Sequence, residues 1–429
     1  MNSLLGVYKM KIYVKKIFIL SLFIVTVLFT NLNIVYATDN NADAPEITSG
    51  AALLIDNKTN KILYDKNASE RMFPASTTKI MTAILVLENC ELNEIVTASY
   101  DALMNIPEGY VSAEIQVEEQ FTVEQLLEML LVHSANDAAN VLAEYVGGSI
   151  QSFISMMNTK VNELGLTNTH FTNTYGLQED NHYTTAYDLA EIMQYCIQND
   201  DFRRIAGSVS CSIPATNKSD VRSYTSTNQL ILPDSPNYYS YVTVGKTGFT
   251  TEAGRCLVSC AYRNDIELTC VILGGTLSSD GISSRFTDSI NLYEYGFNHF
   301  SLKNIANPGD IITTIEVSNA TPATKSLDLA FVDSIHALVN NSDLETNYIP
   351  EIQLNSDISA PIAEGDVLGK AIYTIDGISY EADIVATHSV ESSQLLQFIL
   401  QIGAILIALL ITFQIFFSKK KEKNDLSDI

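Results

Sequence analysis

Apolar and polar positions between residues 45 and 66 predict two strands joined by a turn. The apolar segments 51–55 and 61–64 flank the polar stretch 56–60, and this is the pattern of a β-hairpin. From Ser76 to about residue 200 the apolar positions recur every three or four residues, as they do in helices that bury one face. The chain therefore begins its folded part with a hairpin and continues into a mainly helical region.

Short strands dominate the second half of the chain, and one helix separates two groups of them. Segments 255–263 and 266–273 alternate in the manner of strands around a two-residue polar turn, and a helix is predicted near 284–299. After this helix the chain changes to short Val, Ile and Thr runs between turns rich in Gly, Asn and Asp. We expect a small β-rich domain over residues 301–390, without a catalytic constellation of its own.

The N-terminal segment has the composition of an export signal. Lysines at positions 9, 11, 15 and 16 precede the apolar run 17–30, and the small-residue sequence Val35-Tyr36-Ala37 follows. A charged region, a short apolar core and a small-residue exit are the parts of a signal peptide. We predict a signal peptide over residues 1–37; a non-cleaved anchor that extends toward Ile34 is the alternative.

A second long apolar segment lies near the other end, at residues 395–417. It is long enough to cross a bilayer, and apolar residues surround it on all sides, which disfavours the alternative of a buried amphipathic helix. Four lysines between positions 419 and 423 follow at once, and such flanks tend to stay in the cytoplasm. We expect a single-pass protein of the cell membrane with a cytoplasmic tail, 418–429, and with residues 38–394 outside the cytoplasm.

The chain is strongly acidic, with 50 Asp and Glu against 25 Lys and Arg and a formal net charge of −25. Eight of the basic residues and three of the acidic ones flank the two apolar segments, so the part between them carries about −30. Such a charge repels phosphate backbones and anionic lipid headgroups. We therefore expect no nucleic-acid partner for this part of the chain.

Three short motifs stand in one order along the chain: Ser76-Thr77-Thr78-Lys79, Ser134-Ala135-Asn136 and Lys246-Thr247-Gly248. Each motif alone is weak, since the chain also contains a second S-x-x-K at Ser418 and another S-x-N triplet at Ser226. Local context favours the first set, because its members open a helix, join two helices and stand on a strand edge. Together they describe a serine acyl-transfer site.

Ser76 and Lys79 are predicted to share one face of a helix that begins near Ser76. Residues three apart on a helix are neighbours, so the Lys79 amine reaches the Ser76 hydroxyl as a base reaches its nucleophile. The Ser76 N–H also falls in the first turn, where backbone donors are unpaired and negative charge is favoured. The alternative for this segment alone is a serine that merely caps the helix.

The other two motifs have structural alternatives of their own. Ser134 and Asn136 fit a helix-to-helix turn, where short polar side chains serve as caps, and Lys246 fits a hairpin turn as a solvated lysine. In the catalytic interpretation Ser134 relays a proton to the leaving amine and Asn136 donates to the acyl-side carbonyl. Glycines beside Lys246, including Gly248, permit the close approach of another backbone.

Lys79 accepts a proton only when it is neutral, so its pKa has to fall. A shift of the pKa from about 10.4 to about 7 takes roughly 4–5 kcal/mol. A second ammonium about 4 Å away supplies about 4 kcal/mol at an effective dielectric of about 20, and partial desolvation adds to it. Lys246 is the candidate for that cation, and the sequence leaves open which of the two lysines loses its proton.

The six cysteines show no C-x-x-C spacing, and the chain has no His-Glu-x-x-His segment. We therefore expect no metal site and no metal or organic cofactor. An even number of cysteines in an exported chain permits disulfides, but several lie in strand-like stretches, and buried free thiols are the expectation. Three histidines near the motifs, His133, His170 and His182, are predicted to have packing or structural roles.

With these motifs the chain resembles the penicillin-recognising serine enzymes, and among them the low-molecular-mass penicillin-binding proteins that act as D-alanyl-D-alanine carboxypeptidases. The likeness spans roughly residues 45–300, and beyond the three motifs it rests on segments 134–139, 164–171, 173–177 and 182–190. The resemblance implies an α+β, β-lactamase-like fold: an antiparallel sheet packed with helices beside an all-helical lobe, with the site at their junction. It also implies that the following β domain is a stalk or interaction module.

The resemblance further implies roles for individual residues. Ser76 looks like the acylated nucleophile with Lys79 as its base, and Thr247 looks like a residue that binds the substrate carboxylate. The oxyanion hole maps onto the N–H groups of Ser76 and Phe249, where two donors meet the developing charge. Arg285 is similar to an arginine that helps to hold the carboxylate in some members; a surface arginine is the alternative.

The expected function is the removal of the terminal D-alanine from peptidoglycan stem peptides through an acyl-Ser76 intermediate, with β-lactam antibiotics as covalent ligands. Two departures from the family pattern stand out. Phe249 occupies a variable position that bears on specificity, and Glu118-Glu119 stands where members commonly show Gly-Glu. The alternatives are a catalytically idle penicillin-binding scaffold and a β-lactamase, whose E-x-x-L-N motif residues 163–168 only approximate.

Overall fold

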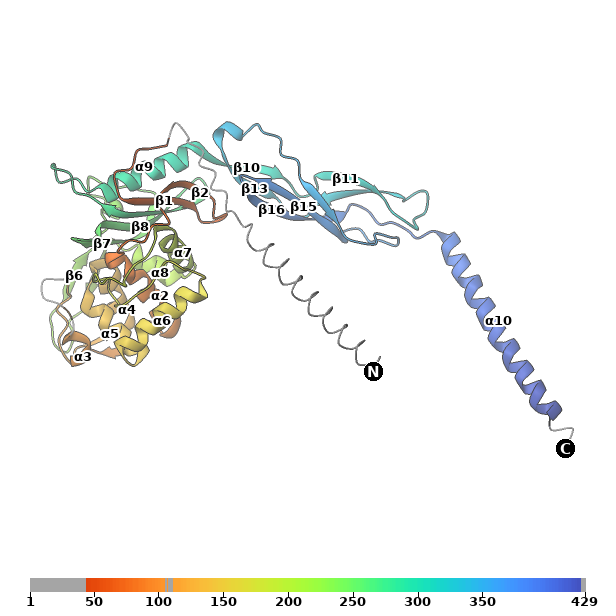
Figure 1. The fold of residues 1–429 in the computed structure, drawn as a ribbon, viewed down its shortest axis with the longest axis horizontal. Helices are drawn as coiled ribbons and strands as arrows, with labels where there is room; N and C mark the ends of the chain where they lie inside the picture. The colour runs from red at the N-terminus through yellow and green to blue at the C-terminus, as the bar shows by residue number, and fades with distance from the viewer. Residues whose placement is uncertain (1–43, 105, 107–110, 426–429) are drawn as a thin grey trace, which may run out of the picture. The chain divides into compact units, whose positions relative to one another are not determined.

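The computed structural model describes residues 44–104, 106 and 111–425, so the expected signal peptide lies outside the described residues. The centre of the fold is a five-stranded antiparallel sheet of order β2-β1-β9-β8-β7 (Figure 1). Its strands are β1 (Ala51–Asp56), β2 (Ile62–Lys66), β7 (Val242–Thr250), β8 (Gly254–Arg263) and β9 (Ile266–Gly275). The predicted hairpin and the two predicted later strands are all present.

The sheet is buried on both faces, and β1 shows why. Ala51, Leu53 and Ile55 pack into one hydrophobic core, whereas Ala52 and Leu54 pack into a second one. Successive side chains of a strand point to opposite faces, so a strand that is apolar throughout has to lie between two layers. The helix α9 (Ser284–His299), whose bounds are those predicted, packs on one of these faces.

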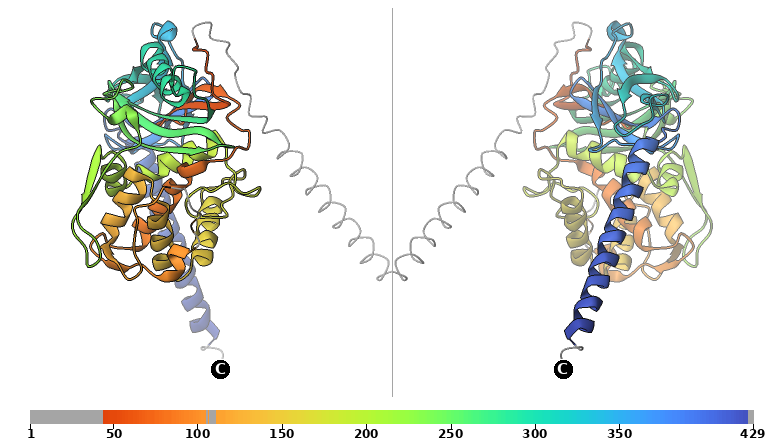
Figure 2. Two further views of the ribbon diagram at one scale, coloured as in Figure 1. Left: turned by 90° about the vertical axis from the view of Figure 1, so that its left-hand side faces the viewer. Right: turned by 90° about the vertical axis from the view of Figure 1, so that its right-hand side faces the viewer.

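The opposite face of the sheet meets a helical lobe, which Figure 2 shows on the other side from α9. The lobe's helices are α2 (Lys79–Asn89), α3 (Tyr100–Met104), α4 (Val123–Glu128), the π-helical turn η2 (Met129–His133), α5 (Asn136–Gly147), α6 (Ile150–Glu163), α7 (Ala186–Cys196) and α8 (Asp200–Ala206). Two small hairpins complete it: β3 (Ile95–Thr97) with β4 (Gln120–Thr122), and β5 (Ser210–Ile213) with β6 (Arg222–Thr225).

An all-β region with its own hydrophobic core follows α9. Its five-stranded antiparallel sheet has the order β11-β12-β16-β15-β14, and β10 pairs with β13. Strand β16 buries every second residue toward its end, Ala382, Ile384 and Ala386, which is the pattern of a sheet with one covered face. The strands are β10 (Phe300–Ala306), β11 (Ile311–Glu316), β12 (Ser326–Phe331), β13 (Ile335–Asn340), β14 (Glu351–Leu354), β15 (Val367–Ile375) and β16 (Ile378–Ala386).

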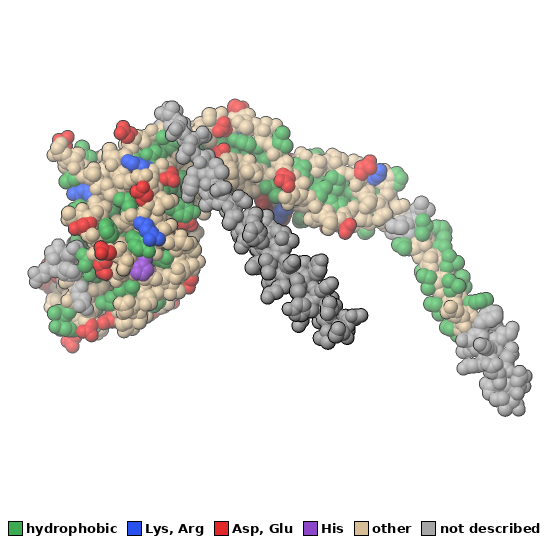
Figure 3. Space-filling view, in the orientation of Figure 1, with side chains coloured by type: hydrophobic (Ala, Val, Ile, Leu, Met, Phe, Trp, Pro, Cys, Tyr) green, Lys and Arg blue, Asp and Glu red, His purple; other side chains and the backbone are tan. Residues whose placement is uncertain are grey.

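The last described element is the helix α10 (Gln394–Asp425). Its stretch Phe398–Ile415 has a mean hydropathy of 2.4, and none of these side chains is buried. In Figure 3 hydrophobic side chains cover this stretch of the helix. It is the one helix in the described part of the chain that is long and apolar enough to cross a membrane.

Candidate active site

Ser76 lies in a short 3-10 helix, η1 (Ala75–Thr78), that continues directly into α2. The helix thus begins where the sequence predicts, although its first turn is tighter than an α-helix. Ala75 has a φ of 49°, in the left-handed region, which costs a residue with a Cβ about 1–2 kcal/mol. A strained residue next to a reactive side chain is typical of functional sites.

Lys79 is fully buried, and its Nζ has three oxygen neighbours. Ser76 Oγ lies at 2.9 Å, Asn136 Oδ1 at 2.7 Å and the Tyr175 carbonyl oxygen at 2.9 Å. The two carbonyl oxygens only accept hydrogen bonds. A neutral amine donates its two N–H groups to them, and its lone pair then faces the Ser76 hydroxyl. The surroundings of Lys79 therefore suit an amine that takes a proton from Ser76.

The electrostatics of the site favour neutral lysines. Burial holds the pKa of Lys79 well below its ordinary value of 10.5, Lys246 lowers this pKa further, and Asp137 acts in the opposite direction. Burial also lowers the pKa of Lys246 to about 7, with a smaller contribution from Arg285. Desolvation is thus the larger cause for both lysines, whereas the sequence pointed to the second ammonium, because burial is not visible in a sequence.

Ser134 and Asn136 lie in the turn between η2 and α5. Ser134 ends a π-helical turn with a φ of 71°, and π-helical turns are frequent at functional sites. The residue at the N-cap position of α5 is Ala135, which provides no side-chain cap, so helix capping does not explain the two polar residues. Instead Ser134 Oγ accepts a hydrogen bond of 2.8 Å from Lys246 Nζ, while Asn136 accepts one from Lys79.

Lys246, Thr247 and Gly248 are buried in the strand β7, so the alternative of a solvated lysine in a hairpin turn is wrong. A Cβ atom at Gly248 would lie 2.9 Å from Ser76 N. Only glycine therefore lets β7 approach the Ser76 N–H so closely. Lys246 Nζ also donates to the Thr247 carbonyl at 2.9 Å, which fixes the amine over the strand.

Arg285 and Phe249 are both neighbours of Gly248 at this strand end. Arg285, in the first turn of α9, donates from Nη1 to the Gly248 carbonyl at 3.0 Å. It is partly buried, and burial lowers its pKa to about 10, with Arg255 as a further cause, so it is not a surface arginine. Phe249 is 55% exposed, and the Arg255 guanidinium lies 5.0 Å from its ring centroid.

Two further residues lie beside the site: Thr227, which the sequence did not indicate, and His182, for which it predicted a structural role. Thr227 belongs to a rival S-x-N triplet, yet its Oγ1 lies 2.6 Å from Thr247 Oγ1. His182 Nδ1 accepts the Thr172 N–H at 3.1 Å, so its Nε2 donates to Thr78 Oγ1 at 2.8 Å. Burial lowers the pKa of His182 to about 3, which agrees with a neutral, structural histidine behind the Ser76 turn.

The cysteines take no part in these contacts. All six are free thiols; Cys90 is partly buried and the other five are buried. Burial raises the pKa of Cys256, which lies in the strand next to β7, to about 11, and a protonated thiol is a poor nucleophile. The expectation of buried free thiols therefore agrees with the structure for five of the six.

Comparison with known proteins shows which families the chain matches. Residues 38–276, more than half of the chain, match the family described as D-alanyl-D-alanine carboxypeptidase (Peptidase_S11). The chain belongs to the D-alanyl-D-alanine carboxypeptidase family. Residues 300–392 match a second family, the C-terminal domain of penicillin-binding protein 5. The membership confirms the resemblance drawn from the motifs and the class of serine peptidase that it implied.

Curated members of the D-alanyl-D-alanine carboxypeptidase family align with most of this chain. DacF of Bacillus subtilis is 28% identical over 353 residues, which is 81% of this chain and 87% of that protein. DacC of Escherichia coli is 28% identical over 366 residues, 82% of this chain and 87% of that protein. The structure of penicillin-binding protein 5 from Haemophilus influenzae has a TM-score of 0.64 at 27% identity and covers 81% of this chain and 99% of that chain. The α+β fold followed by an all-β domain is thereby confirmed.

Proposed function

We propose that this protein is a serine-type D-Ala-D-Ala carboxypeptidase that removes the terminal D-alanine from peptidoglycan stem peptides, and that β-lactams acylate the same serine. The observation that carries the proposal is the position of Lys79 Nζ, 2.9 Å from Ser76 Oγ, with carbonyl oxygens as its other two neighbours. Membership of the D-alanyl-D-alanine carboxypeptidase family supports the same reaction.

The reaction divides among the residues of the three motifs. Lys79 takes the proton of Ser76 Oγ, which attacks the carbonyl carbon of the penultimate D-alanine. The N–H groups of Ser76 and Phe249 hold the oxyanion. Ser134 Oγ passes its proton to the leaving amine. Lys246, which donates a hydrogen bond to Ser134 Oγ, then supplies a new proton to it. Water then hydrolyses the acyl-Ser76 ester, and no step uses a metal or an organic cofactor.

The strand β7 binds the substrate. It is an edge strand of its sheet, and edge strands present backbone groups to which an extended peptide pairs. Asn136 donates to the carbonyl on the acyl side, while Thr247 and Arg285 receive the terminal carboxylate. Arg285 Nε is buried and has no hydrogen-bond partner among the described residues, so it is a donor that a carboxylate would satisfy.

We further infer that α10 anchors the protein in the cell membrane as a single pass, with the tail 418–429 in the cytoplasm and the enzyme domain outside. The apolar stretch Phe398–Ile415 supports the span, and the lysines that follow it support the orientation. In this orientation the active site would face the stem peptides outside the cytoplasmic membrane, and the acidic charge of that part disfavours binding to nucleic acid.

Intact-mass spectrometry of the detergent-purified protein with a β-lactam, beside Ser76→Ala, tests the proposal when it is combined with D-alanine release from a diacyl-Lys-D-Ala-D-Ala peptide. One adduct that the variant lacks, together with D-alanine release, is the expected result. An adduct without release would favour the idle scaffold. Rapid β-lactam turnover would favour a β-lactamase, although Glu163, which its motif requires, is exposed and pairs with Lys160 at 3.1 Å.

A further inference from the structure

Asp137, the residue after the second motif, binds loop 111–116 with its carboxylate. It is buried and accepts a hydrogen bond from Ser112 Oγ at 2.6 Å. It also accepts the backbone N–H groups of Ala113 at 3.0 Å and Ile115 at 3.1 Å. A carboxylate that satisfies three donors of one loop fixes the course of that loop.

The same loop also contacts residues at both ends of the Ser134-Ala135-Asn136 turn. At the end of the turn, the Asn136 N–H donates to the Val111 carbonyl at 2.9 Å. Before the turn, His133 Nε2 lies 3.2 Å from the Ser112 carbonyl, and the His133 ring stacks on Tyr224 of β6 with centroids 4.2 Å apart. A displacement of the loop therefore displaces the turn.

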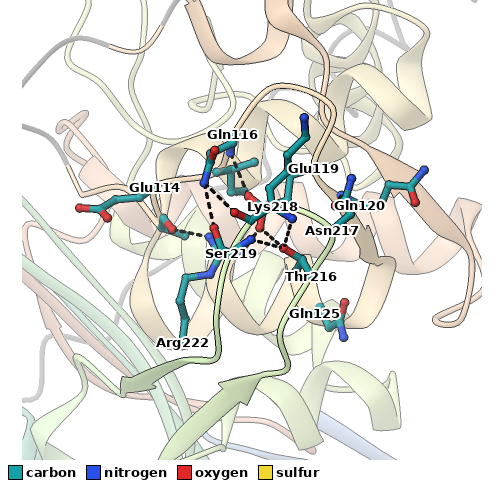
Figure 4. A network of polar contacts seen from close by, with 12 residues as sticks. Glu114, Gln116, Glu119, Gln120, Gln125, Thr216, Asn217, Lys218, Ser219 and Arg222 are labelled. Atoms are coloured by element: carbon teal, nitrogen blue, oxygen red, sulfur yellow. Dashed lines mark hydrogen bonds and ion pairs between the residues drawn. The ribbon is translucent and has the colours of Figure 1, made fainter.

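A buried ion pair ties the loop to the hairpin β5–β6. The Glu119 side chain is fully buried, and its Oε1 lies 2.6 Å from Nη2 of Arg222. Arg222 Nη1 donates to the Ala113 carbonyl at 3.0 Å, so one guanidinium holds a carboxylate and the loop backbone. Thr216 Oγ1 and the Gln116 N–H also donate to Glu119. Figure 4 shows these side chains converging between the loop and the hairpin.

This pair is suited to hold a position rather than to add stability. A buried ion pair contributes little net stability, yet removal of one partner leaves an uncompensated buried charge. Arginine is required for the arrangement, because its fork of donors reaches two acceptors at once, whereas lysine presents a single ammonium. Arg222 also rests on the buried ring of Phe121 in β4, with 5.1 Å between guanidinium and ring centroid, which fixes the fork itself.

We propose that Arg222 and Glu119 are positioning residues for acyl transfer. They act through loop 111–116 and Asp137, and they hold Ser134 and Asn136 where these residues contact the two lysines. Neither residue touches the substrate. The inference rests on the proposed function, in which these contacts move protons, and it adds to that function two residues that lie in none of the three motifs.

Arg222→Met tests the proposal, with Arg203→Met as its matched control. Arg203 forms a comparable pair with Glu267 at 2.6 Å elsewhere in the fold and does not contact the loop. We expect Arg222→Met to lower the rate constant of Ser76 acylation, per folded molecule, by about 10-fold to 100-fold, since a displacement of about 1 Å has such an effect. KM for the peptide should change less than about threefold. Arg203→Met should leave the acylation rate constant unchanged.

Arg222→Lys and Glu119→Gln supply milder variants that keep the site occupied and the fold intact. Lysine reaches only one of the two acceptors, so it should recover part of the rate that Arg222→Met loses. Glu119→Gln keeps an oxygen for Arg222 but turns a donor toward the Gln116 N–H, so we expect an intermediate loss. A wild-type acylation rate constant in Arg222→Met, or equal losses in Arg222→Met and Arg203→Met, would overturn the proposal.

Hydrogen exchange in the full chain provides a second measurement that needs no turnover. The N–H groups of Ala113, Ile115 and Asn136 should exchange faster in Arg222→Met and Arg222→Lys than in Arg203→Met. Unchanged protection of these three groups would overturn the proposal even if the wild type is never acylated. Failure of the wild type to react with β-lactams or peptides would instead count against the proposed function, so the two failures are distinguishable.

Discussion

Burial is the main cause of the lowered pKa of Lys79, and its two carbonyl neighbours and one hydroxyl decide where the lone pair of the neutral amine points. Replacement of Lys79 by Arg tests its role as the base, because a guanidinium stays protonated and cannot take the proton of Ser76, although it still provides donors for the two carbonyl oxygens. We expect the acylation rate constant to fall about 10²-fold to 10⁴-fold, the usual contribution of a general base. Stopped-flow mixing with a fluorescent penicillin measures it, and a rate within threefold of the wild type would exclude Lys79 as the base.

Lys246 makes the stability of the fold depend on pH. Its pKa falls from an ordinary 10.5 to about 7 on burial, so between these values the unfolded chain holds a proton that the folded chain has lost. The contribution of this group to stability therefore rises with pH across this window, by at most about 1.4 kcal/mol per pH unit. Below pH 7 both states are protonated and the full penalty of burying the ammonium remains.

The variant Lys246→Met lacks this titration. The free energy of unfolding of the wild type should therefore rise relative to that of the variant as the pH increases from 7 to 10. Urea unfolding at several pH values measures the difference, in which the contributions of titrating groups that do not interact with Lys246 cancel. A difference that stays constant over this range would contradict the depressed pKa.

Glu118 is one of the two departures from the family pattern, and its backbone conformation suggests a cost in stability. Its φ of 65° lies in the left-handed region, where glycine is favoured, and glycine is the residue that the resemblance leads us to expect here. Its ion pair with Lys218, at 3.8 Å, is exposed and contributes little. We expect Glu118→Gly to raise the free energy of unfolding by about 1 kcal/mol. Glu124→Gly in the helix α4 is the control and should lower the free energy of unfolding by about the same amount. If denaturant unfolding shows that both substitutions change this free energy in the same direction, the left-handed φ of Glu118 does not destabilise the fold.

At the scale of the elements, the contact between β7 and the Ser76 turn depends on one missing side chain. A Cβ at Gly248 would lie 2.9 Å from Ser76 N and 3.0 Å from the Pro74 carbonyl. Both are backbone atoms, so Gly248→Ala has to push β7 away from the oxyanion donors. We expect acylation to fall about 100-fold. Gly148→Ala, at a left-handed helix end with open space around it, should reduce stability yet leave acylation per folded molecule unchanged.

Elements with a regular apolar period could be predicted from the sequence, whereas irregular ones could not. The bounds of α9 and the positions of β8 and β9 follow from local periodicity. The π-helical turn η2 and the left-handed Ser134 have no such signal, since a single extra residue in a turn leaves the apolar pattern almost unchanged. His133 and Asn136, on either side of Ser134, contact loop 111–116, and local periodicity cannot indicate such a contact.

At the scale of the whole molecule, the motif residues could be predicted from the sequence, whereas the residues that hold them in place could not. The order of the three motifs, together with the local context of each, predicted Ser76, Lys79 and Lys246, because each residue type carries its own chemistry. Thr227 and Arg222 belong to none of the three motifs, and they lie near the site only because the fold brings the hairpin β5–β6 and the segment after it beside the second and third motifs. Sequence alone could therefore predict which chemistry the site performs, but not which residues hold it in place.

The position of the apolar stretch in α10 leads to a last prediction about the whole chain. Its residues Phe398–Ile415 belong to none of the three hydrophobic cores, so their exposed apolar surface is available to a bilayer and unnecessary for the fold. A chain that ends at residue 393 should leave the membrane fraction and react with β-lactams at the rate of the full chain. Alkaline extraction of membranes, followed by labelling with a fluorescent penicillin, measures both properties. A truncated chain that still sediments with membranes would show that another segment anchors it, and a large loss of acylation would show that α10 supports the active site.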